Sequence, residues 1–185
     1  LFDRDMHIDE GLGPLFNGDS CRACHFEPNQ GGAGPLGVNV VHHGTRSGDD
    51  FDVPGCGRTI LAKLASPGLP REEPPEEHNV FESRQTPALY GMGLIEQIPM
   101  ETILALADPD DADGDGIRGE ARVLEDGRLG RFGWKANVPT SHEFVRDALT
   151  HELGGTLPPE EGQTFGILTD DDEFSDPEFS VDQIE

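Results

Sequence analysis

The sequence predicts a mainly α fold with extensive coil, and two observations support this prediction. The 185 residues include 24 glycines and 15 prolines, about a fifth of the chain against about 12% in an average protein. Because both residue types interrupt regular structure, we expect short helices, long loops and few strands. The helix signals also fall in short, separate segments with their own start and stop residues.

Three segments carry these helix signals: residues 59–65, 100–107 and 141–153. Pro99 precedes the second segment and Pro109 follows it, which is the expected order for a helix start and stop. Thr140 or Ser141 can cap the third segment, and Gly154 can close it.

We expect residues 1–155 to form one domain and residues 156–185 to form an acidic tail, or a linker to a second domain that this chain lacks. Residues 26–58 are glycine-rich and predict irregular structure, and residues 66–78 predict an exposed loop. The stretch from residue 170 onwards has few core residues, which predicts disorder unless a partner holds it. The chain begins Leu1-Phe2 without Met or signal peptide, as a mature or trimmed product would.

The formal net charge is −24 at pH 7. Such a surface repels phosphates, which excludes nucleic acid as a partner and disfavours anionic membranes. It fits cationic partners, bound divalent cations, adaptation to high salt, or only a soluble acidic surface. No run of 18 apolar residues exists, so we expect no membrane span.

Residues Cys21-Arg22-Ala23-Cys24-His25 form a C-x-x-C-H motif, which is typical of covalent haem attachment. Two thiols one turn apart can bond to one haem, and the adjacent imidazole can bind its iron. A thioredoxin-like site would need a preceding strand in a βαβ unit, and a zinc site a second pair of ligands. The motif therefore predicts one haem c on Cys21 and Cys24, with His25 as an axial ligand.

Two flanking stretches, Leu15-Phe16 and Gly34-Pro35-Leu36, resemble segments of class I cytochromes c. This resemblance implies a cytochrome c-like haem domain with loop-rich extensions. It also implies that the Pro35 carbonyl accepts a hydrogen bond from the free ring nitrogen of His25, which would fix the ring.

The sequence leaves several candidates for the sixth haem ligand. Met92 lies between two glycines that leave room for a flat cofactor, and it is our first candidate, although such a Met is also a common core residue. His42 and His43 are the next candidates. The weaker candidates are Met6, His7, His78 and Met100.

Five stretches of the chain together resemble the di-haem oxidoreductases, also called thiol oxidoreductases, which are distantly similar to di-haem cytochrome c peroxidases. The stretches are residues 11–17, 31–35, 85–96, 107–116 and 130–136. The family carries a second C-x-x-C-H motif in a C-terminal half, which this chain lacks. Met ligation by Met92 is suggested by this sequence and not by the family.

The resemblance implies that this chain is the relay haem domain of a di-haem oxidoreductase or peroxidase, which passes electrons to a second haem domain or redox partner. A non-catalytic cytochrome subunit of a larger assembly is the alternative. Trp134 could carry an electron or pack as a core aromatic, and Arg131 and Lys135 could neutralise haem propionates or lie in solvent. Covalent haem assembly implies a periplasmic or extracellular location.

A second motif, residues 111–116, matches the first half of a calcium-binding EF-hand loop. Asp111, Asp113 and Asp115 would supply oxygens, and Ile117 its carbonyl. Arg122 stands where the bidentate Glu is needed, so Asp108, Asp110 or Glu120 would have to complete the shell. The loop predicts either a structural calcium ion or a solvated acidic turn.

The third cysteine, Cys56, has no partner once haem has taken the other two. It is either a buried thiol or a disulfide partner for a segment outside this chain.

Overall fold

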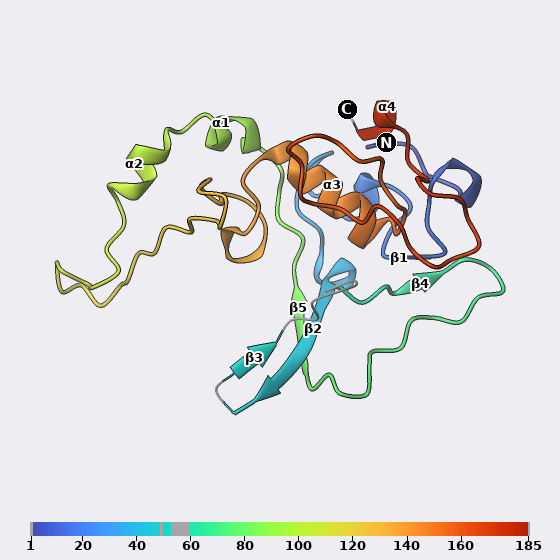
Figure 1. Ribbon diagram of the computed structural model, residues 1–185, viewed down its shortest axis with the longest axis horizontal. Coiled ribbons are helices and arrows are strands. Elements are labelled where there is room, and N and C mark those ends of the chain that lie inside the picture. Colours follow the sequence, from blue (N-terminus) through green and yellow to red (C-terminus); the bar gives the residue numbers. More distant parts are fainter. Residues whose placement is uncertain (1, 49, 53–59, 185) are drawn as a thin grey trace. The chain divides into compact units, whose positions relative to one another are not determined.

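The structure is a computed structural model that describes residues 2–48, 50–52 and 60–184 (Figure 1). The chain divides into two compact units, and each is considered by itself. The first contains residues 1–90 and 146–185, and the second contains residues 91–145. The longest helix, α3 (Ser141–Glu152), runs from one unit into the other.

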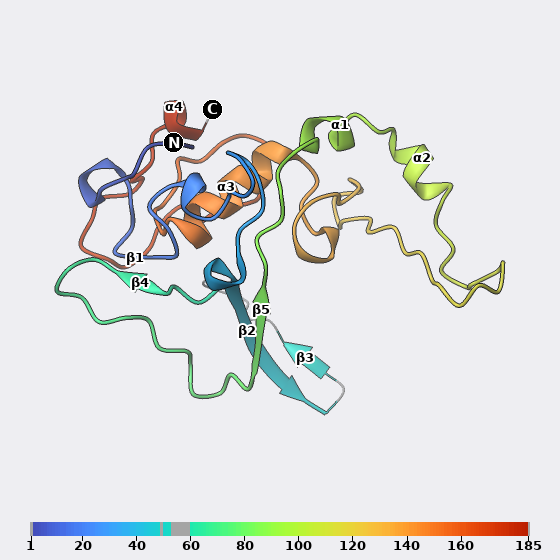
Figure 2. The ribbon, with the colours of Figure 1, turned by 180° about the vertical axis from the view of Figure 1, so that it is seen from behind.

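A three-stranded antiparallel sheet in the first unit has the order β3-β2-β5. Figure 2 shows β2 (Val40–Ser47) and β5 (Val80–Arg84) side by side, with Val40 opposite Arg84 and Gly44 opposite Val80. Strand β3 (Asp50–Asp52) pairs with the end of β2. The prediction of irregular structure over residues 26–58 is therefore wrong for these strands, because β-branched residues in β2 pair with a segment distant in sequence.

The helix expected over residues 59–65 is also wrong for the described part. Ile60 forms an isolated bridge with His42. Strand β4 (Leu64–Ala65) pairs with β1 (Leu15–Phe16). The helix propensity of this segment is outweighed by its strand pairing with β1, which precedes the C-x-x-C-H motif.

The core of the first unit lies along the apolar side of α3. Its buried residues are Met6, Leu12, Leu149, Leu153, Leu157, Phe179 and Ile184, with Phe16 packed against them. The expected disorder of the C-terminal stretch is therefore wrong: Phe179 is only 1% exposed, and Ile184 belongs to the short helix α4 (Val181–Ile184). Hydrogen bonds add to this packing: the Phe179 amide donates to the Thr156 carbonyl at 3.0 Å, and the Gln183 side chain donates to the Glu10 carbonyl at 2.9 Å.

Helix α3 begins and ends as its sequence predicts. The Thr140 hydroxyl accepts a hydrogen bond from the Glu143 amide at 3.1 Å, so Thr140 is the capping residue. Gly154 has a φ of 84° and donates its amide to the Leu149 carbonyl at 3.0 Å, which ends the helix.

The second unit contains α1 (Met92–Glu96), α2 (Met100–Leu104) and the turn η4 (Trp134–Ala136). Helix α2 is shorter than expected because a turn at its end leads into a loop closed by paired backbone bonds between Asp108 and Gly119. Arg128 forms a two-pronged ion pair with the fully buried Glu143, at 2.7 and 3.0 Å.

The remaining elements are three short 3-10 turns: η1 (Ile8–Glu10), η2 (Cys21–Ala23) and η3 (Leu36–Val38). The coil-rich character of the chain is confirmed, but short strands accompany the helices, so the fold is less helical than predicted. The cytochrome c-like fold stays a prediction. Within the described residues, none of the helices has the length and apolar character to span a membrane.

Candidate haem-attachment site

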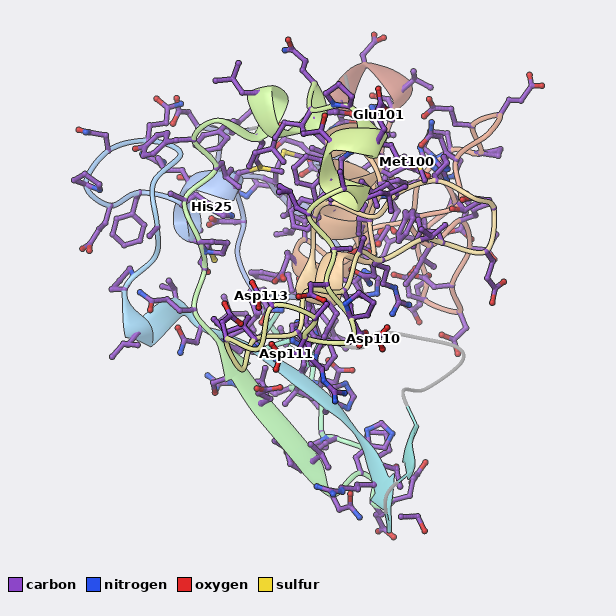
Figure 3. The ribbon with its side chains drawn as sticks, turned by 90° about the vertical axis from the view of Figure 1, so that its left-hand side faces the viewer. His25, Met100, Glu101, Asp110, Asp111 and Asp113 are labelled. Carbon is purple, nitrogen blue, oxygen red and sulfur yellow. The ribbon has the colours of Figure 1, made fainter. Side chains whose placement is uncertain are left out.

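Turn η2 gathers the residues of the C-x-x-C-H motif. The amides of Cys24 and His25 both donate to the Cys21 carbonyl, at 3.2 and 3.0 Å. Figure 3 shows His25 beside this turn. The two cysteines and the imidazole thus project from a single turn, as attachment to one porphyrin requires.

The segment that precedes the turn is bound to the end of α3 by two backbone hydrogen bonds. The Asn17 amide donates to the Glu152 carbonyl at 2.7 Å, and the Gly13 amide donates to the Leu153 carbonyl at 2.9 Å. A Cβ at Gly13 would collide with the Gly154 backbone, so this approach requires glycine. The turn is therefore positioned by the core of the unit.

His25 is oriented by a carbonyl distant in sequence. Its Nδ1 lies 3.0 Å from the Pro87 carbonyl oxygen. A carbonyl only accepts, so Nδ1 carries the proton and Nε2 keeps the lone pair that a metal needs. Burial lowers the pKa of His25, more than its backbone hydrogen bonds raise it, which favours the neutral ligand form.

The expectation that Pro35 orients His25 is wrong in this structure. The Pro35 carbonyl accepts a hydrogen bond from the Val38 amide at 3.0 Å, within turn η3. The Gly34 amide donates to the Thr86 carbonyl at 3.0 Å, which brings Pro87, the next residue, to the ring instead.

Both motif cysteines are half-buried free thiols. Burial raises the pKa of Cys24 to about 11, and the charge of Glu152 is the next cause. Burial also raises the pKa of Cys21. Both groups are therefore neutral thiols near pH 7, the form that reacts slowly in disulfide exchange.

The surroundings fit a large apolar cofactor. Phe26 and Leu36 flank the motif in sequence and are 37% and 74% exposed, and Tyr90 is 56% exposed. Exposed side chains such as these leave apolar surface that a bound porphyrin can cover. Together with two thiols and one oriented imidazole, they match the requirements of haem c.

The candidate sixth ligands fall into two groups. Of those in the first unit, the His43 Nδ1 lies 2.6 Å from the His78 Nδ1, and the His43 ring stacks on Phe81. Burial is the main cause that lowers the pKa of His42. Met6 is 2% exposed and belongs to the core, which disfavours it as a ligand. Met92 and Met100 lie in the second unit, where each is the first residue of its helix and is partly buried.

The aspartate loop gathers a different set of ligands from the one expected. Ligand oxygens of Asp108, Asp111 and Asp113 lie within 4.8 Å of one another. Asp115 does not belong to this group, and its Oδ1 accepts the Ile117 amide at 2.8 Å. Figure 3 labels Asp110, Asp111 and Asp113 on the loop after α2. Calcium stays a prediction, now with Asp108 in place of Asp115.

The other predicted residues have local roles in the second unit or lie outside the described part. The Arg131 guanidinium donates to the Ile95 carbonyl at 3.1 Å. The Lys135 ammonium lies 5.8 Å from the centre of the Trp134 ring, a cation–π distance. Cys56 lies outside the described residues.

Two residues near the motif were not predicted from the sequence. Pro87 belongs to a stretch that resembles the family, but nothing in the sequence joins it to His25. Glu152 reads as an ordinary residue in the last turn of a helix. Both become visible only through contacts between distant segments.

Comparison with known proteins gives one family. Residues 76–165 match the family described as "Di-haem oxidoreductase, putative peroxidase". The matched segment begins after the C-x-x-C-H motif and contains Pro87, the aspartate loop and all of α3. No curated protein and no solved structure matches the chain.

Proposed function

Since residues 76–165 match the di-haem oxidoreductase family, we propose that the chain belongs to this family and is a c-type cytochrome domain that relays electrons to a second haem domain or a redox partner protein. The observation that carries the proposal is the 3.0 Å hydrogen bond from His25 Nδ1 to the Pro87 carbonyl. It joins the haem motif to the family segment and fixes the tautomer that binds iron through Nε2.

Each residue of the turn has one task in this proposal. Cys21 and Cys24 bond covalently to the haem edge, and His25 binds the iron. The bound haem supplies a one-electron couple. Met92 is the proposed sixth ligand, with His42 and His43 as alternatives; Met ligation would give a higher potential than a second His.

The alternative is a cytochrome subunit that only passes electrons within a larger assembly. The two differ outside this haem, because a di-haem peroxidase needs an open iron site on a second haem, whereas an assembly that only carries electrons needs no open iron site. We propose a periplasmic or extracellular location for either, because covalent haem attachment takes place across the cytoplasmic membrane.

The test is a spectroscopic redox titration of the chain produced in a periplasm with haem-attachment machinery. We expect one reversible one-electron transition and a low-spin, six-coordinate spectrum. Met92→Leu should open the sixth position and allow peroxide to bind, while the matched variant Met100→Leu should leave the spectrum unchanged. A haem that cannot be reversibly reduced would refute electron transfer, and an unchanged Met92→Leu spectrum would exclude Met92.

A further inference from the structure

Glu152 is a shielded carboxyl group beside the haem-attachment turn, with no part in the proposed electron transfer. Its backbone carbonyl binds the Asn17 amide at 2.7 Å. Gly18 follows Asn17, and a Cβ placed there would lie 3.8 Å from the Cys24 sulfur. Glu152, Asn17 and the Cys24 thiol are therefore neighbours.

The side chain of Glu152 has few hydrogen bonds to replace those that its carboxylate would make to water. Its Oε2 is buried and has no hydrogen-bond partner within 3.5 Å among the described residues, and the nearby Asn17 side-chain amide compensates it only in part. A buried oxygen of this kind is costly when charged and cheaper when protonated. Burial accordingly raises the pKa of Glu152 to about 7, so both forms are populated near neutral pH.

Charged and polar groups surround Glu152 on several elements. His151 on α3, the Asn17 side chain and Lys63 beside β4 favour the ionised form, in that order, and Asp147 on α3 opposes it. The Glu152 charge in turn raises the pKa of Cys24. The Glu152 carboxylate and the Cys24 sulfur therefore interact electrostatically through partly buried protein, where charges are screened less than in water.

We propose that Glu152 is a proton-binding site coupled to electron uptake by the attached haem. This inference rests on the proposed function. One electron arrives from the redox partner and one proton from water, and an O–H bond forms at the Glu152 carboxylate. On oxidation the electron leaves, that O–H bond breaks, and the proton returns to solvent. The added proton offsets the negative charge that reduction brings next to a shielded carboxylate.

The test is the midpoint potential of the haem-loaded full chain between pH 5 and pH 9, for the wild type and for Glu152→Gln. In the wild type the potential should fall with rising pH around neutrality, approaching 59 mV for each tenfold change in proton concentration. In Glu152→Gln this dependence should disappear, because the amide cannot take up the proton. Asp19→Asn is the matched control: it removes another carboxylate that acts on Cys24 and should keep the slope.

A second measurement uses the native protein and does not depend on folding of the variant. The infrared difference spectrum between the reduced and oxidised protein at pH 7 should show the carbonyl band of a protonated carboxyl group appearing on reduction. A haem-bearing protein without this band, or a slope that survives in Glu152→Gln, would overturn the inference and leave electron transfer intact. A chain without covalent haem would overturn the proposed function as well.

Discussion

The haem-attachment turn and the aspartate loop are both short, residue-dense sites, but they are held in opposite ways. The turn depends on distant partners: Pro87 lies 62 residues from His25, and Asn17 is bound to the end of α3. The loop is held by its own residues, through carboxylates that accept amides two to five residues ahead and through the Asp108–Gly119 bridge. We therefore expect substitutions in distant segments to change the structure of the turn, and only substitutions within the aspartate loop to change the structure of the loop.

The largest expected effect is loss of the cofactor. The double variant Cys21→Ser, Cys24→Ser should lose all covalent haem, because a hydroxyl does not form the thioether bond. Cys56→Ser is the control and should keep it, since that thiol lies outside the motif. Haem staining of denatured protein measures the result, and covalent haem on the double variant would contradict the role of the turn.

A second expected effect is a pH dependence of the free energy of unfolding, caused by Glu152 at the end of α3. The folded state raises the pKa of Glu152 from 4.5 to about 7, so it favours the protonated form. The resulting stabilisation is present below pH 4.5 and is lost as pH rises through 7, a change of about 3 kcal/mol. Urea unfolding should show this loss in the wild type and not in Glu152→Gln. The exposed Glu101→Gln should behave as the wild type, and equal pH dependence in all three would contradict the prediction.

A third effect separates two glycines of one segment. A Cβ at Gly34 would meet the Val38 side chain and lie 2.6 Å from the Cys24 carbonyl oxygen, whereas a Cβ at Gly37 meets nothing within 4 Å. Gly34→Ala should therefore lower the free energy of unfolding by about 1–3 kcal/mol. Gly37→Ala should be neutral or stabilising by up to about 1 kcal/mol. Denaturant unfolding measures the free energy of unfolding of both variants. Equal changes in the two would contradict the prediction that the close approach at Gly34 requires glycine.

The smallest effect belongs to the aspartate loop. If calcium binds there, its removal by a chelator should lower the melting temperature by about 2–4 °C for each kcal/mol of binding. Asp113→Asn should weaken this response, while Asp115→Asn should keep it, because only Asp113 belongs to the cluster. Calorimetry with and without calcium measures the shift. The absence of any shift in the wild type would remove the calcium prediction and leave a solvated turn.

The sequence predicted the features that depend on neighbouring residues. Thr140 and Gly154 bound α3 because capping is decided within a few positions. The C-x-x-C-H turn was predicted for the same reason. Strands β2 and β5 were not, because each needs a partner from a distant segment. Pro87 replaced Pro35 at His25 because the Pro35 carbonyl is used within its own turn.

Within the aspartate loop the structure groups other carboxylates than the EF-hand spacing does, and calcium binding there stays a prediction. The EF-hand spacing predicts Asp115 as a ligand, while the carboxylates that lie together are those of Asp108, Asp111 and Asp113. Asp108, outside the spacing, joins the cluster because its backbone pairs with Gly119 and draws the loop together. The EF-hand spacing indicates which residues could supply ligand oxygens. The Asp108–Gly119 bridge, which closes the loop, determines which of these carboxylates lie together.

The central claim is that Cys21, Cys24 and His25 hold one haem. The most direct measurement is the mass of the denatured chain after production with haem-attachment machinery, followed by mapping of the modified peptide. We expect the mass of one haem above that of the polypeptide, with both thioether bonds on the peptide that contains residues 21–25. A chain of unmodified mass, with both thiols free to react, would contradict the claim.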